Sequence, residues 1–148
     1  MEQLVREQFL PLSIEKSWDF FSNPNNLPLI TPKELELKIQ SSHVKGKIYL
    51  GDEIDYTVKP IFPFKYKWKT KIIEVTDKVS FTDKQIKGPY AFWEHQHLFE
   101  PVEGGTQMKD IINYKIPYGT IGSIFKPLIE TKLNQIFEYR KSKLETLF

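Results

Sequence analysis

Two histidines spaced two positions apart are the residues of this sequence best placed to do chemistry. They are His95 and His97, within the run from Tyr90 to Phe99. The run alternates like a strand with one buried face, so the side chains that share a face with the histidines are Trp93 and Phe99. An imidazole that faces a protein interior needs a hydrogen-bond partner. The sequence therefore predicts a buried polar pair or cluster on this strand.

Asp110 is the candidate partner. It lies in the run from Thr106 to Ile116, which also alternates, and it falls on the face that should meet the histidines. A hairpin whose tip is Glu103 and Gly104 would place His97 directly opposite Asp110. We therefore predict an inward-facing pair of His97 and Asp110.

This pair admits three interpretations. In the first, His95 and His97 belong to a fixed polar network that stabilises one core arrangement. In the second, a neutral His97 oriented by Asp110 acts as a general base, which makes these two the catalytic candidates. In the third, two histidines and a carboxylate hold a metal ion. A strand His-x-His without any further metal signature favours the first two, so we expect no metal and no cofactor.

The elements before this hairpin follow from periodicity and capping residues. Gln3 to Leu10 predicts a first strand, and Ser13 predicts the N-cap of a short helix over 14–21. A second short helix should extend to about Ile30. Alternating apolar positions then predict four strands, over residues 35–39, 51–58, 64–75 and 79–86.

A change of period follows Gly119. Apolar residues then recur every three or four positions from Ile121 to Leu144, with Arg140 among them, which predicts one long amphipathic helix. Pro127 should kink this helix or mark where its well-formed part begins. The whole sequence thus predicts a single domain over residues 1–148, with seven mostly antiparallel strands.

Composition narrows the classes of function. The aromatic fraction is high at 14%, which favours strands and a roomy apolar interior. Cysteine is absent and the net charge is only +2, so thiol chemistry is excluded and a nucleic-acid partner is not indicated. No run approaches the roughly 18 apolar residues of a membrane span. We expect a cytoplasmic protein with no stable membrane insertion; the sequence does not define its oligomeric state.

A row of lysines on one strand is the remaining charged feature. Lys65, Lys67, Lys69 and Lys71 alternate with the apolar positions of the strand predicted over 64–75. Such a row usually forms a solvated sheet face that discourages edge pairing. The alternative is weak contact with an anionic surface or an acidic partner.

The order of elements and several short motifs resemble a known superfamily. The motifs are GPY at 88–90, WEHQH at 93–97, GGT at 104–106 and IFEYR at 136–140. Together they resemble the SRPBCC, or START-like, superfamily, in its bacterial polyketide cyclase/dehydrase-like branch. The resemblance implies an α+β helix-grip fold, a curved sheet wrapped around the C-terminal helix, with a hydrophobic cavity between them. Some relatives are fused to a nucleotide-sugar-epimerase-like domain, but this sequence has no dinucleotide-binding glycine fingerprint.

The implied cavity gives the predicted function. We expect it to bind a small hydrophobic or amphipathic ligand, lipid or polyketide-like, through a few convergent polar groups. The alternative is a cyclase, dehydratase or isomerase that acts on a polyketide-like carbonyl substrate with His97 and Asp110 as the acid–base pair. No serine-hydrolase, phosphate-loop or zinc-protease motif is present, which favours binding over catalysis. The expected ligand-binding residues are Tyr56, Trp68, Asp83, Gln85, Trp93, His95, His97, Asp110, Tyr114, Phe125 and Ile129.

Overall fold

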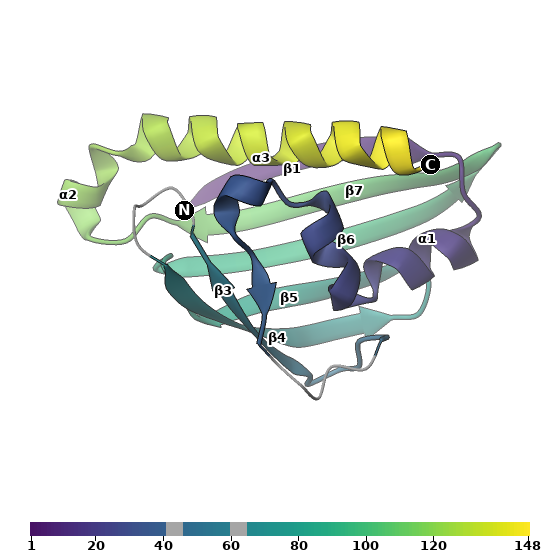
Figure 1. Cartoon of the computed structure of the whole chain (residues 1–148), viewed down its shortest axis with the longest axis horizontal. Coiled ribbons are helices and arrows are strands. Elements are labelled where there is room, and N and C mark those ends of the chain that lie inside the picture. Colours follow the sequence, from purple (N-terminus) through teal and green to yellow (C-terminus); the bar gives the residue numbers. More distant parts are fainter. Residues whose placement is uncertain (41–45, 60–64) are drawn as a thin grey trace.

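An antiparallel sheet curves around one long helix in this protein (Figure 1). The computed structural model describes residues 1–40, 46–59 and 65–148. Within them the sheet has seven strands in the order β1-β7-β6-β5-β4-β3-β2, and each neighbouring pair is antiparallel. The strands are β1 (Glu2–Leu10), β2 (Lys38–Ile39), β3 (Glu53–Val58), β4 (Tyr66–Thr76), β5 (Ser80–Lys87), β6 (Phe92–Val102) and β7 (Gly105–Lys115).

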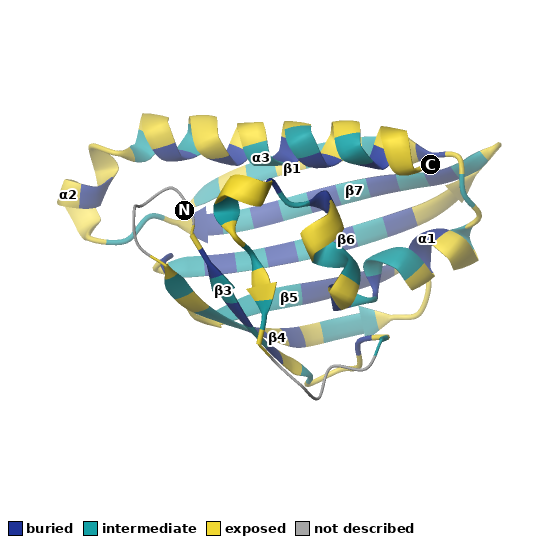
Figure 2. Cartoon of the chain, in the orientation of Figure 1, coloured by how far each residue is buried: buried dark blue, intermediate teal, exposed yellow. Residues whose placement is uncertain are grey.

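Helical segments cover the concave face of the sheet in two places. The segment after β1 contains α1 (Ile14–Phe21) and two 3-10 helices, η1 (Pro24–Ile30) and η2 (Lys33–Leu35). The C-terminal part contains the short α2 (Gly119–Ser123) and the long α3 (Lys126–Leu147). Figure 2 shows a buried stripe of α3 facing the sheet and an exposed stripe facing outward. The predicted α+β class and order of elements are therefore confirmed.

The β6–β7 hairpin has the predicted register. Val102 pairs with Gly105, and His97 lies directly opposite Asp110. Gly104 at the tip has a φ of 83°, a backbone conformation that side chains with a Cβ rarely adopt. The alternation of buried and partly exposed residues along both strands fixes this register, because a one-residue slip of either strand would turn its buried face outward.

Two predicted elements differ in the structure. The strand expected over 35–39 is reduced to the two residues of β2, because Glu36 has a positive φ of 49° that turns the chain at the end of η2. Leu37 and Ile39 nevertheless still pack on the core. The long C-terminal helix is interrupted after α2, and Pro127 lies in the first turn of α3, where its missing N–H costs no hydrogen bond. Phe64, the first residue of the strand predicted over 64–75, lies outside the described residues.

The core consists of two clusters of buried side chains. One lies under α1 and includes Trp18, whose ring meets Phe81 and Phe99 edge-on. The other lies between α3 and the neighbouring ends of β6 and β7, and it includes Ile129. Trp68 of β4 packs against both clusters. No helix within residues 1–40, 46–59 and 65–148 has the length and hydropathy needed to span a membrane.

The lysine row begins at Lys65, just before strand β4, and continues along that strand at alternate positions. Lys65, Lys67 and Lys71 are exposed. Lys69 is half-buried, and its Nζ lies 3.9 Å from carboxylate oxygens of both Glu53 and Asp55 on the adjacent β3. Acidic residues of the neighbouring strand thus offset part of this positive charge, as expected for a solvated sheet face.

Candidate functional site

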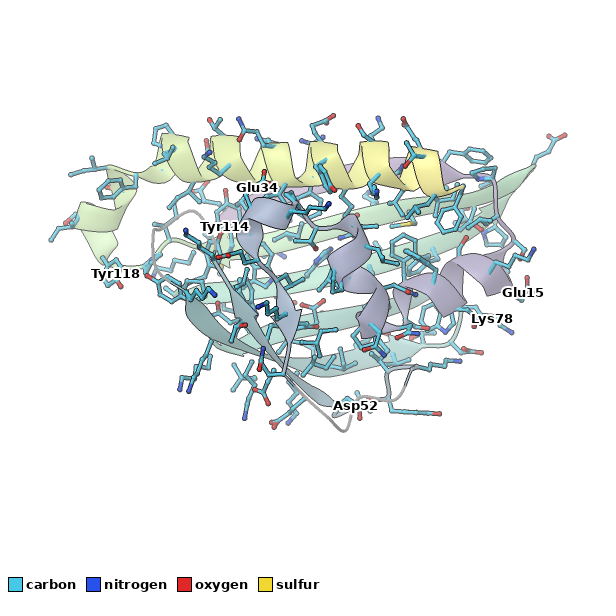
Figure 3. The ribbon with its side chains drawn as sticks, in the orientation of Figure 1. Glu15, Glu34, Asp52, Lys78, Tyr114 and Tyr118 are labelled. Carbon is cyan, nitrogen blue, oxygen red and sulfur yellow. The ribbon has the colours of Figure 1, made fainter. Side chains whose placement is uncertain are left out.

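A cavity of about 220 Å³ lies between the concave face of the sheet, α3 and the segment of η1 and η2. Side chains of the sheet and of the helices extend into the space between these layers (Figure 3). The cavity wall is mainly apolar and rich in aromatic rings. Its aromatic members include Phe21, Tyr56, Trp68, Phe81, Trp93 and Phe137. A few polar side chains interrupt this apolar surface, and they include Thr70, Asp83, His95, His97 and Arg140.

The two histidines of β6 lie side by side in this wall, and both are buried. Their rings stack with centroids 3.7 Å apart and planes 22° apart. His97 also stacks on Phe81, with centroids 4.0 Å apart. These stacked contacts hold both imidazoles in fixed orientations, because neither ring can rotate without displacing a neighbour.

Each histidine is hydrogen-bonded to a different carboxylate. The Nε2 of His95 lies 2.8 Å from Oδ1 of Asp110, and the Nε2 of His97 lies 2.7 Å from Oδ2 of Asp83. The strand register places His97 directly opposite Asp110 and His95 directly opposite Asp83. Each hydrogen bond therefore runs diagonally, to a residue two positions along the neighbouring strand from the one directly opposite. His97 Nδ1 and Asp110 Oδ1, the pair expected from the sequence, lie 3.5 Å apart, and each of these two residues makes its shorter hydrogen bond to another partner.

Arg140 of α3 closes this polar cluster from the helix side. Its side chain is buried, and Nη2 lies 3.8 Å from Oδ1 of Asp110, an ion-pair distance beyond hydrogen-bond range. The guanidinium also lies 5.5 Å from the ring of Phe21 and 5.6 Å from that of Phe137. Its Nε has no hydrogen-bond partner in the described part of the chain. A buried cation with donors to spare is therefore present in the cavity wall.

The protonation states follow from burial and from these contacts. Burial would raise the pKa of Asp110, but the charge of Arg140 and the hydrogen bond from His95 outweigh it and hold that pKa well below its usual range. Burial would likewise raise the pKa of Asp83, and the hydrogen bond from His97 outweighs it, so that this pKa too is lowered. Both carboxylates are therefore ionised at neutral pH.

His97, in contrast to the two carboxylates, is held in its uncharged form. Its burial, together with the stacked His95, lowers the pKa of His97 to about 4, although Asp83 and Asp110 partly counteract the shift. At neutral pH His97 is thus uncharged, and its bond to the Asp83 carboxylate requires the proton on Nε2. Nδ1 is then an acceptor, and it has no hydrogen-bond partner among the described residues. Burial and the nearby Asp83 charge also raise the pKa of Tyr56, which keeps its hydroxyl protonated.

The geometry is that of a hydrogen-bonded network and fits a metal centre poorly. Donor atoms of Asp83, His95 and His97 lie within 4.8 Å of one another. However, the imidazole planes are nearly parallel, so their in-plane lone pairs do not converge on one point. The Nε2 atom of each ring is already engaged by a carboxylate.

The structure places six of the predicted site residues in the cavity wall and five elsewhere. Those in the wall are Tyr56, Trp68, Asp83, Trp93, His95 and His97, whereas those outside it are Gln85, Asp110, Tyr114, Phe125 and Ile129.

Each of these five has a structural reason for its position. Gln85 bonds to the backbone of Tyr90 in both directions and so closes the turn before β6. Asp110 lies behind the imidazoles that it holds, whereas Tyr114 and Ile129 are buried in the second core cluster. Phe125 precedes α3 and is 47% exposed, because the helix is interrupted there. This end of the molecule, where Tyr118 and α2 lie, is away from α1 (Figure 3).

Sequence reasoning missed Arg140 as a site residue, together with its helical neighbours Leu133 and Phe137. The signal was present, because Arg140 occupies a position in the apolar period of the C-terminal helix. A charged residue at a core position needs a buried partner. Asp110 and Arg140 could therefore have been paired from the sequence.

Comparison with known proteins identifies the fold. Neither the protein-family models nor the curated proteins gave a match to the sequence. Among solved structures, protein TTHA0849 from Thermus thermophilus is similar with a TM-score of 0.74 and 15% identity, over 98% of this chain and 95% of that one. The pollen-allergen-like protein Ara h 8.0201 is similar with a TM-score of 0.64 and 15% identity, over 98% of both chains.

A third similar structure is a nucleoside-diphosphate sugar epimerase from Corynebacterium glutamicum, with a TM-score of 0.68 and 21% identity. The match covers 95% of this chain but 28% of the epimerase chain. Together these similarities define this protein as one with a START/SRPBCC-like helix-grip fold. At such identities the fold is shared, and the ligand has to be argued from the site itself.

Proposed function

We propose that this protein binds a small hydrophobic or amphipathic molecule in the cavity between the sheet and α3. The observation that carries the proposal is an apolar, aromatic cavity with one fixed polar cluster in its wall. Such a combination supplies burial for an apolar body and orientation for a polar end. The START/SRPBCC-like fold supports the same function, because hydrophobic-ligand binding is typical of that class.

The volume sets the size of the molecule. A protein cavity of about 150 Å³ accommodates benzene, so a cavity of about 220 Å³ corresponds in proportion to about nine heavy atoms. The ring-lined wall favours a flat or unsaturated body, because aromatic side chains stack well on such surfaces. A larger ligand would require the helices to move away from the sheet.

Native mass spectrometry of the protein purified from its own cells tests this proposal. We expect a retained small molecule at a 1:1 ratio, and we expect Ile136→Phe to lose it, since Ile136 lines the cavity and the larger ring would fill the space. Leu128→Phe is the matched control on the same helix, because Leu128 is 49% exposed and outside the cavity wall. Equal retention by both variants would place the bound molecule elsewhere and contradict the proposal.

His97 supports a second candidate function, catalysis on a carbonyl substrate by a cyclase, dehydratase or isomerase. It is uncharged at neutral pH, is oriented by Asp83 and has an unpartnered Nδ1 among the described residues, and these are three of the properties that a general base needs. The pair differs from the predicted one, because Asp83 takes the role that the sequence assigned to Asp110. Loss of turnover with retained binding in His97→Gln would separate this function from binding alone.

A further inference from the structure

The two carboxylates of the polar cluster differ in how their negative charges are balanced. Asp110 lies outside the cavity wall and has a cationic partner, since Nη2 of Arg140 is 3.8 Å from its Oδ1. Asp83 bonds to Nε2 of His97 at 2.7 Å and to the hydroxyl of Thr70 at 3.4 Å, and both partners are uncharged at neutral pH. No lysine or arginine in the described part of the chain pairs with Asp83. Asp83 is therefore an ionised carboxylate without a counter-ion among these residues.

The side chain of Asp83 is open to the cavity. Asp83 lies in the cavity wall, and 19% of its side-chain surface remains accessible, compared with 9% for Asp110. Oδ2 accepts the short hydrogen bond from His97, whereas Oδ1 has the long contact with Thr70. An ionised carboxylate can accept about four hydrogen bonds. Lone pairs of Asp83 therefore remain for a donor that enters from the cavity.

Aromatic rings of the cavity wall border this carboxylate. Phe81 lies two residues before Asp83 on the same face of β5, and Trp93 is its diagonal neighbour on β6, since Asp83 pairs directly with His95. Burial and the Asp83 charge raise the pKa of Tyr56, whose ring on β3 also lines the cavity. A cation is attracted to the face of an aromatic ring, most strongly where water is excluded. The wall thus offers a cation a carboxylate and aromatic rings together.

The charge of a ligand's polar end decides how well it fits this carboxylate. An anion would add a further negative charge to a space of low dielectric, which is costly. A neutral polar group would leave the charge of Asp83 without a counter-ion. A protonated amine supplies the opposite charge and donates charge-assisted hydrogen bonds to the carboxylate. The positive charge of Arg140 opposes such a ligand only weakly, because Asp110 offsets it.

We propose that the cavity binds an amphipathic amine, whose ammonium group pairs with Asp83 while its flat apolar body lies among the aromatic rings of the wall. The volume of about 220 Å³ limits that body to about one aromatic ring with a short side chain. The ammonium keeps its protons and donates to the free lone pairs of the carboxylate. This inference rests on the proposed binding function and names the ligand class for the same cavity.

Isothermal titration calorimetry at pH 7 with three matched probes tests the inference: cinnamylamine, cinnamyl alcohol and trans-cinnamic acid. They share one aromatic body of a size that suits the cavity, and they differ in the polar end. At this pH an aliphatic amine is protonated and a carboxylic acid is ionised. We expect the amine to bind at least about tenfold more tightly than the alcohol, because it gains both an ion pair and ring contacts in a dry site. The acid should bind more weakly than the alcohol.

The variant Asp83→Asn assigns the preference to one residue. Asparagine keeps the volume and an acceptor for His97, and it leaves no cation of the described residues without its partner. We therefore expect the variant to fold, to bind the alcohol as well as the unsubstituted protein does, and to lose the preference for the amine. Asp77→Asn is the matched control and should keep that preference, because Asp77 is exposed and lies outside the cavity wall.

The outcomes distinguish the inference from the function on which it rests. Equal affinity for amine and alcohol, tightest binding of the acid, or a preference for the amine that persists in Asp83→Asn would overturn the amine inference and leave apolar-ligand binding in place. Failure of all three probes to bind would overturn both. If Asp83→Asn is unfolded, the three probes on the unsubstituted protein still decide whether the cavity prefers a cation.

Discussion

Replacing Asp110 by Asn should destabilise the protein far more than the same substitution on the surface. Asp110 is buried, accepts a 2.8 Å hydrogen bond from His95 and lies 3.8 Å from Arg140, which is also buried. Asparagine keeps the volume and a carbonyl acceptor for His95, but it leaves the Arg140 charge without a counter-ion. Removing one partner of a buried ion pair costs about 3–5 kcal/mol. The melting temperature should therefore fall by at least about 6 °C for a chain of this length.

Urea unfolding followed by tryptophan fluorescence measures this loss, with Asp77→Asn as the matched control. Asp77 is exposed, and its ion pair with Lys47 at 3.4 Å should contribute less than about 1 kcal/mol. Adding Arg140→Gln to Asp110→Asn should recover part of the loss, because the double variant buries no unpaired charge. Similar costs for Asp110→Asn and Asp77→Asn, or purely additive costs in the double variant, would refute the assignment of a buried ion pair.

Two further predictions concern pH and metals. Because the pKa of His97 is about 4 in the folded protein and about 6.5 unfolded, the unfolded state binds more protons between these values, and stability should fall by up to about 3 kcal/mol as the pH drops through this window. In His97→Gln this part of the loss should disappear in urea titrations at pH 7 and pH 4; an unchanged dependence would show that His97 is not buried in its neutral form. Because His95 and His97 are hydrogen-bonded to carboxylates, we expect Zn²⁺ to leave the melting temperature unchanged. A metal present at about 100 times its dissociation constant would add about 2.7 kcal/mol of stability, and the corresponding rise of about 5 °C or more would contradict the hydrogen-bonded arrangement of the two histidines.

The sequence was sufficient to predict the hairpin that carries the site, because two independent signals agreed. Alternation placed His97 and Asp110 on inner faces, and the Glu103–Gly104 tip set the register. The hydrogen-bond partners could not be predicted in the same way. An imidazole is long enough to reach either the opposite residue or its diagonal neighbour, and stacking on Phe81 decided in favour of the diagonal bond to Asp83.

The helical side of the cavity was predicted less well for a related reason. The period of the C-terminal helix identified its inner face, but it did not show which inner residues contact the cavity and which are packed in the core. Ile129 is packed in the second core cluster and does not reach the cavity, whereas Arg140 lines the cavity and Phe137 belongs to both the cluster and the cavity wall. That distinction depends on where the helix crosses the curved sheet and on the break before Lys126. Neither follows from periodicity alone.

The indole N–H signals of a ¹⁵N-labelled sample test the central claim most directly. Trp68 and Trp93 line the cavity, whereas Trp18 is fully buried in the core and outside the cavity wall. Titration with the uncharged probe cinnamyl alcohol should shift the Trp68 and Trp93 signals along saturable curves and leave Trp18 nearly unchanged. Saturable binding that moves none of these signals, or the absence of saturable binding, would contradict the account of a ligand cavity between the sheet and α3.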